Sequence, residues 1–102
     1  MDKTQVEFNG IRCNVDTQQM YKNNRRSINL TDMEDGTPVL TASINIPMEE
    51  LDNDEVIIKN YSENEGILEA LIEARIVSEP VDYANVSKFV TAPICKLLIP
   101  AI

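Results

Sequence analysis

Carboxylates are the side chains of this sequence whose spacing best suits a catalytic or binding role. Glu65, Glu69 and Glu73 recur every fourth residue in the segment "NEGILEALIEA". Residues four apart share one face of a helix, so the three side chains would form a stripe beside an apolar one. A pair of carboxylates can perform acid–base catalysis, as in glycosidases. A chain of 102 residues has little room for a substrate cleft beside its core, so we expect no enzyme activity.

Other chemistries lack their residues. The sequence has no histidine, which excludes a histidine-based triad and a zinc site with histidine ligands. Its two cysteines form no CxxC pair, and its three glycines lie apart rather than in a phosphate-binding loop. Asp52 to Glu55, "DNDE", resembles the start of a calcium loop but lacks the later glycine and glutamate. We expect no metal and no cofactor.

The charge balance bears on partners and location. Nine basic and seventeen acidic residues give a formal net charge of −8. Such a chain is repelled by phosphates, so we expect no direct nucleic-acid binding and a basic protein partner. No apolar run reaches the ~20 residues that span a bilayer, and no signal peptide is recognised at Met1. Cys13 and Cys95 sit among apolar neighbours, which is typical of core residues in a reducing compartment. These observations predict a cytoplasmic protein that binds no membrane.

One helix must carry the carboxylate stripe. Ser62 and Glu65 have the spacing of a capping box, which predicts a helix that begins at Ser62 and stops near Ala74. Gly66 would cost about 1 kcal/mol relative to alanine inside a helix. We therefore expect Gly66 to lie where the helix closely approaches another backbone or a ligand. The glutamate stripe is interpreted either as a solvated face or as a docking surface for a basic partner.

The first half of the sequence alternates as β-strands do. "NG" at residues 9–10 predicts a two-residue hairpin turn that pairs Val6 with Cys13. A second two-residue turn, at residues 23–24, would pair Thr17 with Leu30. A three-residue loop at residues 34–36 would then pair Leu30 with Leu40 and place a glycine in the left-handed conformation.

These turns define the expected fold class. It is α+β, with an antiparallel β-meander of about five to six strands packed on one α-helix in a single domain, residues 1–102. The expected strands are residues 4–8, 11–20, 26–33, 38–46, 55–59 and 89–99, the fifth buried on both faces. Residues 77–89, "VSEPVDYANVSKF", are expected to be a loop, and Pro93 is expected to lie at an edge or bulge. The order of the last two strands stays open, as does the choice between a monomer and a homodimer.

Two segments carry a family resemblance. "EVIIKNYSENEGILEALIEARIV" and "FVTAPICKLL" resemble a family of small uncharacterised (domain-of-unknown-function) proteins encoded by conjugative elements and phages of gut bacteria. The shared pattern, Ile-Lys-Asp/Asn-Tyr-Ser-Glu-Asn-Glu-Gly, falls here on Ile58 to Gly66. One departure is Arg75, where relatives tend to have a glycine that caps the helix. The resemblance implies a mobile-element accessory protein in a bacterial cytoplasm and carries no established activity.

Three functional hypotheses follow. The first is a small acidic protein-binding module, and the second is an acidic nucleic-acid mimic that inhibits a host DNA-binding protein. The third is a small ligand binder or enzyme at the Tyr61–Gly66 segment. The candidate surface combines the positions that capping does not explain with the glutamate stripe: Tyr61, Asn64, Gly66, Glu65, Glu69 and Glu73.

Overall fold

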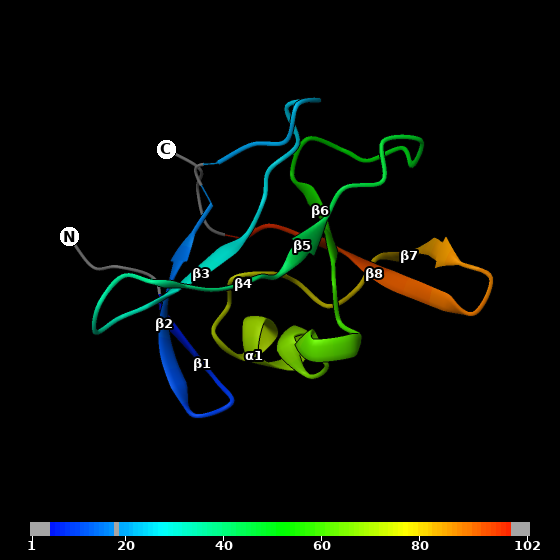
Figure 1. Cartoon of the computed structure of the whole chain (residues 1–102). Helices are drawn as coiled ribbons and strands as arrows, with labels where there is room; N and C mark the ends of the chain where they lie inside the picture. The colour runs from blue at the N-terminus through cyan, green and yellow to red at the C-terminus, as the bar shows by residue number, and fades with distance from the viewer. Residues whose placement is uncertain (1–4, 18, 99–102) are drawn as a thin grey trace.

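The structure is a computed structural model that describes residues 5–17 and 19–98. In this part of the chain, eight strands accompany one 3₁₀ turn and one α-helix (Figure 1). Their bounds are β1 Gln5–Phe8, β2 Ile11–Asp16, β3 Asn29–Asp32, β4 Pro38–Thr41, β5 Ser43–Ile44, β6 Glu55–Ile58, η1 Ser62–Asn64, α1 Ile67–Glu73, β7 Asp82–Ser87 and β8 Val90–Lys96.

The strands form two antiparallel sheets rather than one meander. The first has the order β1-β2-β3-β4 and the second the order β5-β6-β8-β7. The α+β class is confirmed, but a single sheet of five to six strands is wrong. The predicted fourth strand is divided at Ala42, whose N–H donates to the Ile28 carbonyl (2.7 Å) while its carbonyl accepts from the Lys59 N–H (2.8 Å). Ala42 is thus the residue at which the chain passes from one sheet to the other.

The first hairpin is confirmed in turn and register. Val6 pairs with Cys13 and Phe8 with Ile11. Asn9 and Gly10 have φ angles of 52° and 80°, the left-handed pair that a tight hairpin turn requires. The same turn also predicts that Thr4 pairs with Val15, but Thr4 lies outside the described residues.

The second connection differs from its prediction. Tyr21 donates its N–H to the Arg25 carbonyl (2.8 Å), so the loop has three residues rather than two. Asn24 supplies the left-handed conformation, with φ 65°. Leu30 lies opposite Val15 instead of Thr17. Because the slip is two residues, the same side chains still face the core.

The third connection reaches the predicted pairing by another route. Leu30 lies opposite Leu40 as expected, and Gly36 is left-handed with φ 75°. The loop is longer than predicted, because the Asp32 N–H donates to the Thr37 carbonyl (2.8 Å). A register shift next to Leu30 restores the pairing.

The second sheet contains a strand that the sequence did not reveal. Part of the predicted loop at residues 77–89 is β7, an edge strand paired with β8. Pro93 lies opposite Tyr83 of β7, but the β6–β8 pairing ends at Ile57 and Ile94 and does not reach it. On the β6 side Pro93 is therefore locally at an edge, as predicted, and its missing N–H interrupts no bond of that ladder.

The core consists of two clusters separated by the second sheet. The larger cluster joins the first sheet, α1 and one face of the second sheet, and it contains Cys13 and Cys95 as fully buried free thiols. Their interpretation as core residues is confirmed. The smaller cluster gathers Ile57, Ala84, Ala92 and Ile94 on the other face. The predicted burial of β6 on both faces is also confirmed.

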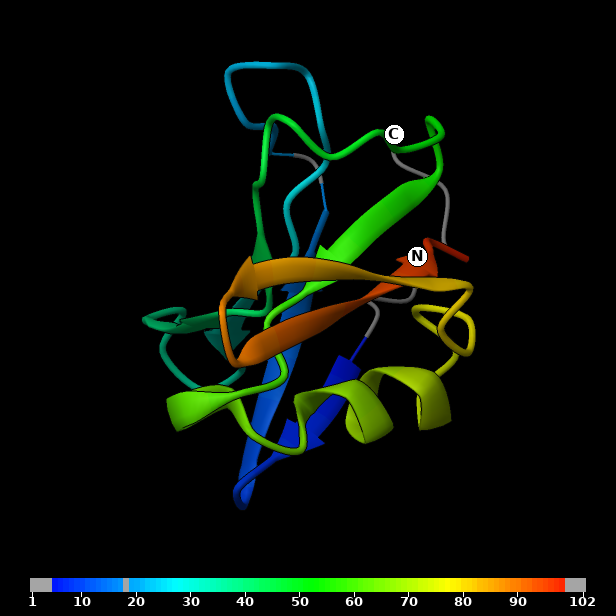
Figure 2. The same ribbon diagram turned by 90° about the vertical axis from the view of Figure 1, so that its right-hand side faces the viewer.

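The helix α1 lies between β1 and the β7–β8 hairpin (Figure 2). Among the described residues, none of the helices has the length and apolar character needed to cross a membrane.

Candidate functional site

The segment that leads into α1 is not the capping box that the sequence predicted. Ser62 is the first residue of a 3₁₀ turn whose N-cap is Tyr61, and it has a φ of 56°. The Ser62 hydroxyl forms no hydrogen bond within the described chain. Glu65 donates its backbone N–H to the Ser62 carbonyl (3.2 Å) instead. The α-helix begins only at Ile67, after Gly66. The helix end was predicted well, because Ala74 is the C-terminal cap.

Asn60 holds the start of the helix. Its Oδ1 accepts hydrogen bonds from the N–H of Gly66 (3.1 Å) and the N–H of Leu68 (3.0 Å). These N–H groups would otherwise lack a partner at the first turn. Capping rules apply two or three residues beyond the cap, whereas Asn60 lies six and eight residues before its donors. For that reason the sequence reasoning missed it.

Three of the predicted site residues shape this turn. Asn64 is 1% exposed and donates through Nδ2 to the Thr41 carbonyl (2.9 Å). Gly66 has φ 94°, and a Cβ there would lie an ordinary 3.8 Å from Phe8 Cε1. The left-handed backbone therefore explains this glycine, and the predicted close approach to another backbone is wrong. Tyr61 packs against the smaller core cluster, with Lys59 Nζ 5.8 Å from its ring centroid.

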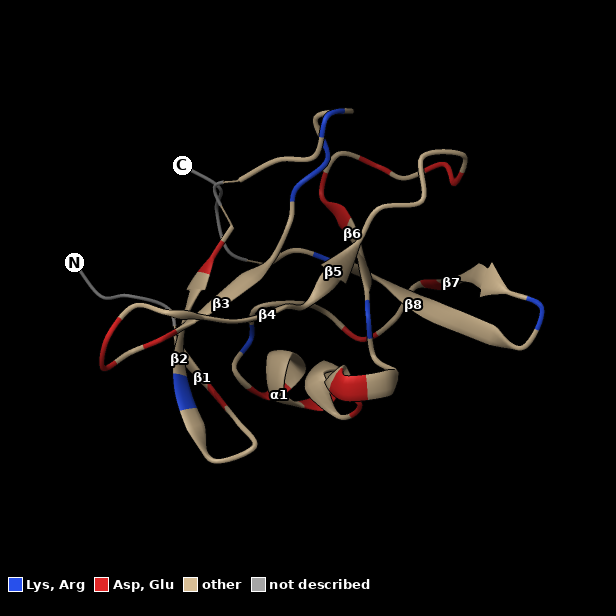
Figure 3. Cartoon of the chain, in the orientation of Figure 1, with Lys and Arg blue, Asp and Glu red and all other residues tan. Residues whose placement is uncertain are grey.

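All three glutamates of the stripe are exposed, but only Glu69 and Glu73 lie on α1. Glu65 precedes the helix, so its predicted place on the same helical face is wrong. Glu65, Glu69 and Glu73 form no ion pair with any residue of the described chain. The nearby pair of Lys59 and Glu63 (2.6 Å) neutralises a different carboxylate, lowering the pKa of Glu63 and raising the pKa of Lys59 through their hydrogen bond. Acidic residues lie along α1, whereas basic residues gather at the β2–β3 tip, and the β7–β8 turn carries the single basic residue Lys88 (Figure 3).

A groove of about 460 Å³ runs along one flank of α1, and we call it the acidic groove. Its half-buried apolar surface comes from the helix and the segment that follows it, and the rim carries three exposed carboxylates. The lining residues are Leu68, Glu69, Ile72, Glu73, Glu79, Pro80 and Tyr83. Tyr83 is 60% exposed, so much of its side chain is open to solvent.

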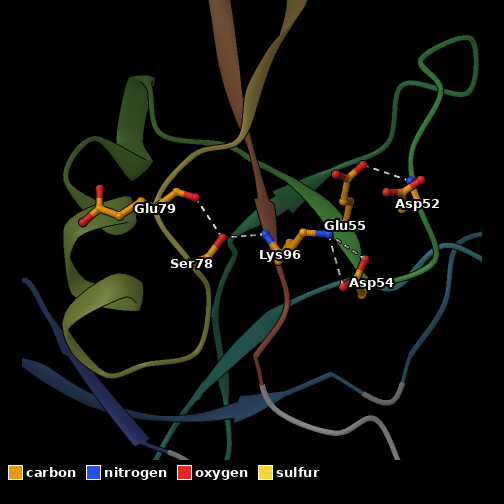
Figure 4. Close-up of polar contacts among 6 residues, drawn as sticks. All are labelled: Asp52, Asp54, Glu55, Ser78, Glu79 and Lys96. Atoms are coloured by element: carbon orange, nitrogen blue, oxygen red, sulfur yellow. Dashed lines mark hydrogen bonds and ion pairs between the residues drawn. The ribbon is translucent and has the colours of Figure 1, made fainter.

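The far wall of the acidic groove is fixed to β8 (Figure 4). Ser78 Oγ donates to the Glu79 carbonyl (2.8 Å) and accepts from the Lys96 N–H (2.9 Å). The Lys96 ammonium lies 3.5 Å from Asp54. These contacts position Glu79 opposite the helix. The sequence reasoning missed this wall, because it assigned residues 77–89 to a loop.

A second groove, of about 560 Å³, lies between α1 and β1. Glu65, Gly66 and Glu73 line it, together with Glu7 and Phe8 from the strand. The stripe is therefore divided: Glu69 faces the acidic groove, Glu65 faces this second groove, and Glu73 borders both. Tyr61 and Asn64 line neither groove.

Comparisons of the chain with known proteins find no relative. No protein-family model matches it, and no significant match is found among curated proteins or solved structures. Among the described residues, no group of three or more cysteine, aspartate or glutamate side chains is arranged to hold a metal ion. The functional argument therefore depends on the two grooves.

Proposed function

We propose that the chain is a small acidic protein-binding module whose acidic groove receives a basic segment of a partner protein. The observation that carries this proposal is an apolar surface bordered by Glu69, Glu73 and Glu79. None of these carboxylates forms an ion pair within the described chain.

Lysine and arginine fit this combination because each has an apolar stem and a charged end. The stem can pack on Leu68 and Ile72 while the cation reaches a carboxylate on the rim. An arginine can also lie over the exposed ring of Tyr83. Each exposed ion pair stabilises by only about 0.2–1 kcal/mol. Burial of apolar surface must therefore supply much of the affinity, and the net charge of −8 would mainly accelerate encounter with a basic partner.

The apolar surface also favours protein binding over nucleic-acid mimicry. A nucleic-acid mimic needs carboxylates spaced like phosphates, and an exposed tyrosine ring does not contribute to such mimicry. Replacement of Tyr83 by serine separates the two hypotheses. We expect Tyr83→Ser to weaken a basic peptide several-fold, because its exposed ring borders the groove. Mimicry alone predicts no change.

The test begins with a displayed library of short linear peptides selected on the wild-type chain. Enriched peptides should carry lysine or arginine beside an apolar residue. The variant Glu69→Lys/Glu79→Lys should bind them at least about tenfold more weakly, a loss of about 1.4 kcal/mol. The matched control, Glu34→Lys/Glu50→Lys, makes the same charge change at exposed positions outside the groove. Equal losses of peptide affinity in both variants would show that only the net charge matters, and this would refute binding in the acidic groove.

We further propose that this module is an accessory protein of a bacterial mobile element and works in the cytoplasm. The Ile58–Gly66 pattern supports the first part, because it resembles that of small proteins encoded by conjugative elements and phages. The buried free thiols Cys13 and Cys95 support the second, since they suit a reducing compartment. Expression of the gene together with transfer or phage functions of its host would test the assignment, and constitutive expression without such functions would contradict it.

A further inference from the structure

The strand β1 forms an edge of the first sheet, and its free side borders the second groove. We call this the β1 groove. It lies on the other flank of α1 from the acidic groove and shares with it only Glu73. Its volume, about 560 Å³, falls within the ~300–1,000 Å³ range of ligand-binding clefts.

The hairpin register fixes which backbone groups face this groove. A two-residue turn makes Phe8 and Ile11 a hydrogen-bonded pair, and alternation makes Val6 and Cys13 the next such pair. Gln5 and Glu7 therefore direct their N–H and C=O groups away from β2. Within the described chain, no other segment forms a backbone hydrogen bond to Gln5 or Glu7. The edge offers two donors and two acceptors to an added strand.

The opposite wall of the groove leaves room for such a strand. Gly66, Ala70 and Ala74 come from the same side of α1, at intervals of four residues, and all three line the groove. Their small side chains keep the helix from filling the space beside β1. A further strand would lie about 4.8 Å from β1 and continue the pleat of the first sheet.

We propose that an extended, basic segment of a partner protein adds to β1 as a further strand of the first sheet, in the β1 groove. Backbone hydrogen bonds to Gln5 and Glu7 would provide the affinity, as in other cases of strand addition. Carboxylates select a basic segment, since Glu7, Glu65 and Glu73 all line the groove. Successive side chains of a strand alternate between its faces, so lysine or arginine is expected at every second position.

The test uses a chain in which the acidic groove is already disabled. A displayed library of short linear peptides is selected on Glu69→Lys/Glu79→Lys, which leaves the lining of the β1 groove unchanged. Failure of the proposed function and failure of the strand site then give different results. Enriched peptides should alternate basic and apolar residues, and they should slow hydrogen exchange at the Gln5 and Glu7 amides.

A substitution separates backbone bonding from charge. Glu7→Pro removes the outward N–H and the carboxylate, while Glu7→Gln removes the charge alone. Because this N–H does not bond to β2, proline there leaves the β1–β2 ladder complete. We expect Glu7→Pro to bind the best peptide at least about tenfold more weakly than Glu7→Gln. Should Glu7→Pro fail to fold, N-methylation of alternate peptide amides replaces it, and only one set of positions should abolish binding.

Four results of the peptide experiments would overturn the proposal. They are no enriched peptide, no protection at Gln5 and Glu7, equal binding by Glu7→Pro and Glu7→Gln, and equal tolerance of both N-methylated sets. A concentration-dependent protection of the same two amides in the peptide-free chain would also overturn it, because a second copy would then occupy the edge.

Discussion

Removal of the Asn60 side chain tests the local structure at the start of α1. Asn60→Ala deletes the oxygen that accepts from Gly66 and Leu68. A hydrogen bond contributes a net ~0.5–1.5 kcal/mol, and loss of a helix cap costs ~0.5–2 kcal/mol. We therefore expect the free energy of unfolding to fall by about 2 kcal/mol. At ~4–8 °C per kcal/mol for a domain of this size, Tm should fall by roughly 8–16 °C.

The comparison variant is Ser62→Ala. A capping box would make this substitution cost about 1 kcal/mol. In the structure the Ser62 side chain caps nothing, so the expected cost is below about 0.5 kcal/mol. Ser62→Gly should even stabilise by about 0.5 kcal/mol, because φ is 56° there. Asn60→Asp keeps an acceptor oxygen and should retain most of the stability.

The assay is urea unfolding followed by far-ultraviolet circular dichroism, because the sequence has no tryptophan to report by fluorescence. All four variants should keep the wild-type m value, so that the midpoints report stability alone. A Ser62→Ala variant that loses as much stability as Asn60→Ala would refute the reasoning and restore the capping box.

Three further predictions concern the stability of the folded chain. Arg75 has φ 62° just after the helix, where its N–H donates to the Ile72 carbonyl. Glycine adopts this left-handed conformation without strain, so Arg75→Gly should raise the free energy of unfolding, measured in urea, by about 0.5–1 kcal/mol. A lower free energy of unfolding would contradict the left-handed helix end. Leu71→Ala should cost about 2–5 kcal/mol, because Leu71 is 0% exposed. Phe89→Ala, at an 89% exposed position, should change the free energy of unfolding by no more than about 0.5 kcal/mol. Similar costs for Leu71→Ala and Phe89→Ala would refute the assigned core. Burial raises the pKa of Cys95 from an ordinary 9.0 to about 11. Because the folded state prefers the neutral thiol, roughly 2–3 kcal/mol of stability is present below pH 9 and is lost as the pH rises towards 11. Cys95→Ala should remove this dependence in urea unfolding measured against pH, and an unchanged profile would show that another group causes it.

Local signals in the sequence predicted what local geometry determines. The turn at Asn9 and Gly10 specifies the first hairpin, because both turn residues accept positive φ and the flanking apolar residues alternate in register. The same logic correctly placed Gly36. The loop after Tyr21 was misjudged, since an Asn-Asn pair fits either a two-residue turn or a three-residue loop with one left-handed residue.

The second sheet depended on contacts that no local pattern encodes. Ala42 bonds to both sheets, and this division of the strand follows from the packing of β5 against β6. Residues 82–87 include charged and polar side chains and follow Pro80, so they were interpreted as a loop. Their pairing with β8 gives them a strand conformation.

The candidate surface was predicted in part. The helical spacing correctly placed Glu69 and Glu73 on α1, where they are exposed, whereas Glu65 lies before the helix in the 3₁₀ turn region. Glu79 and Tyr83 were not predicted, because the wall they form depends on Ser78 and Lys96 meeting across the second sheet. Glu7 was missed for a similar reason: its position beside α1 follows from tertiary packing.

Nuclear magnetic resonance gives the most direct test of the acidic groove. The ¹⁵N-labelled wild-type chain is titrated with the strongest basic peptide from the wild-type selection, and amide shifts are mapped along the sequence. Binding in the acidic groove predicts the largest shifts in residues 68–73 and 79–83. Shifts confined to other surfaces, such as the β2–β3 tip at residues 22–26, or spread evenly over the chain, would contradict it.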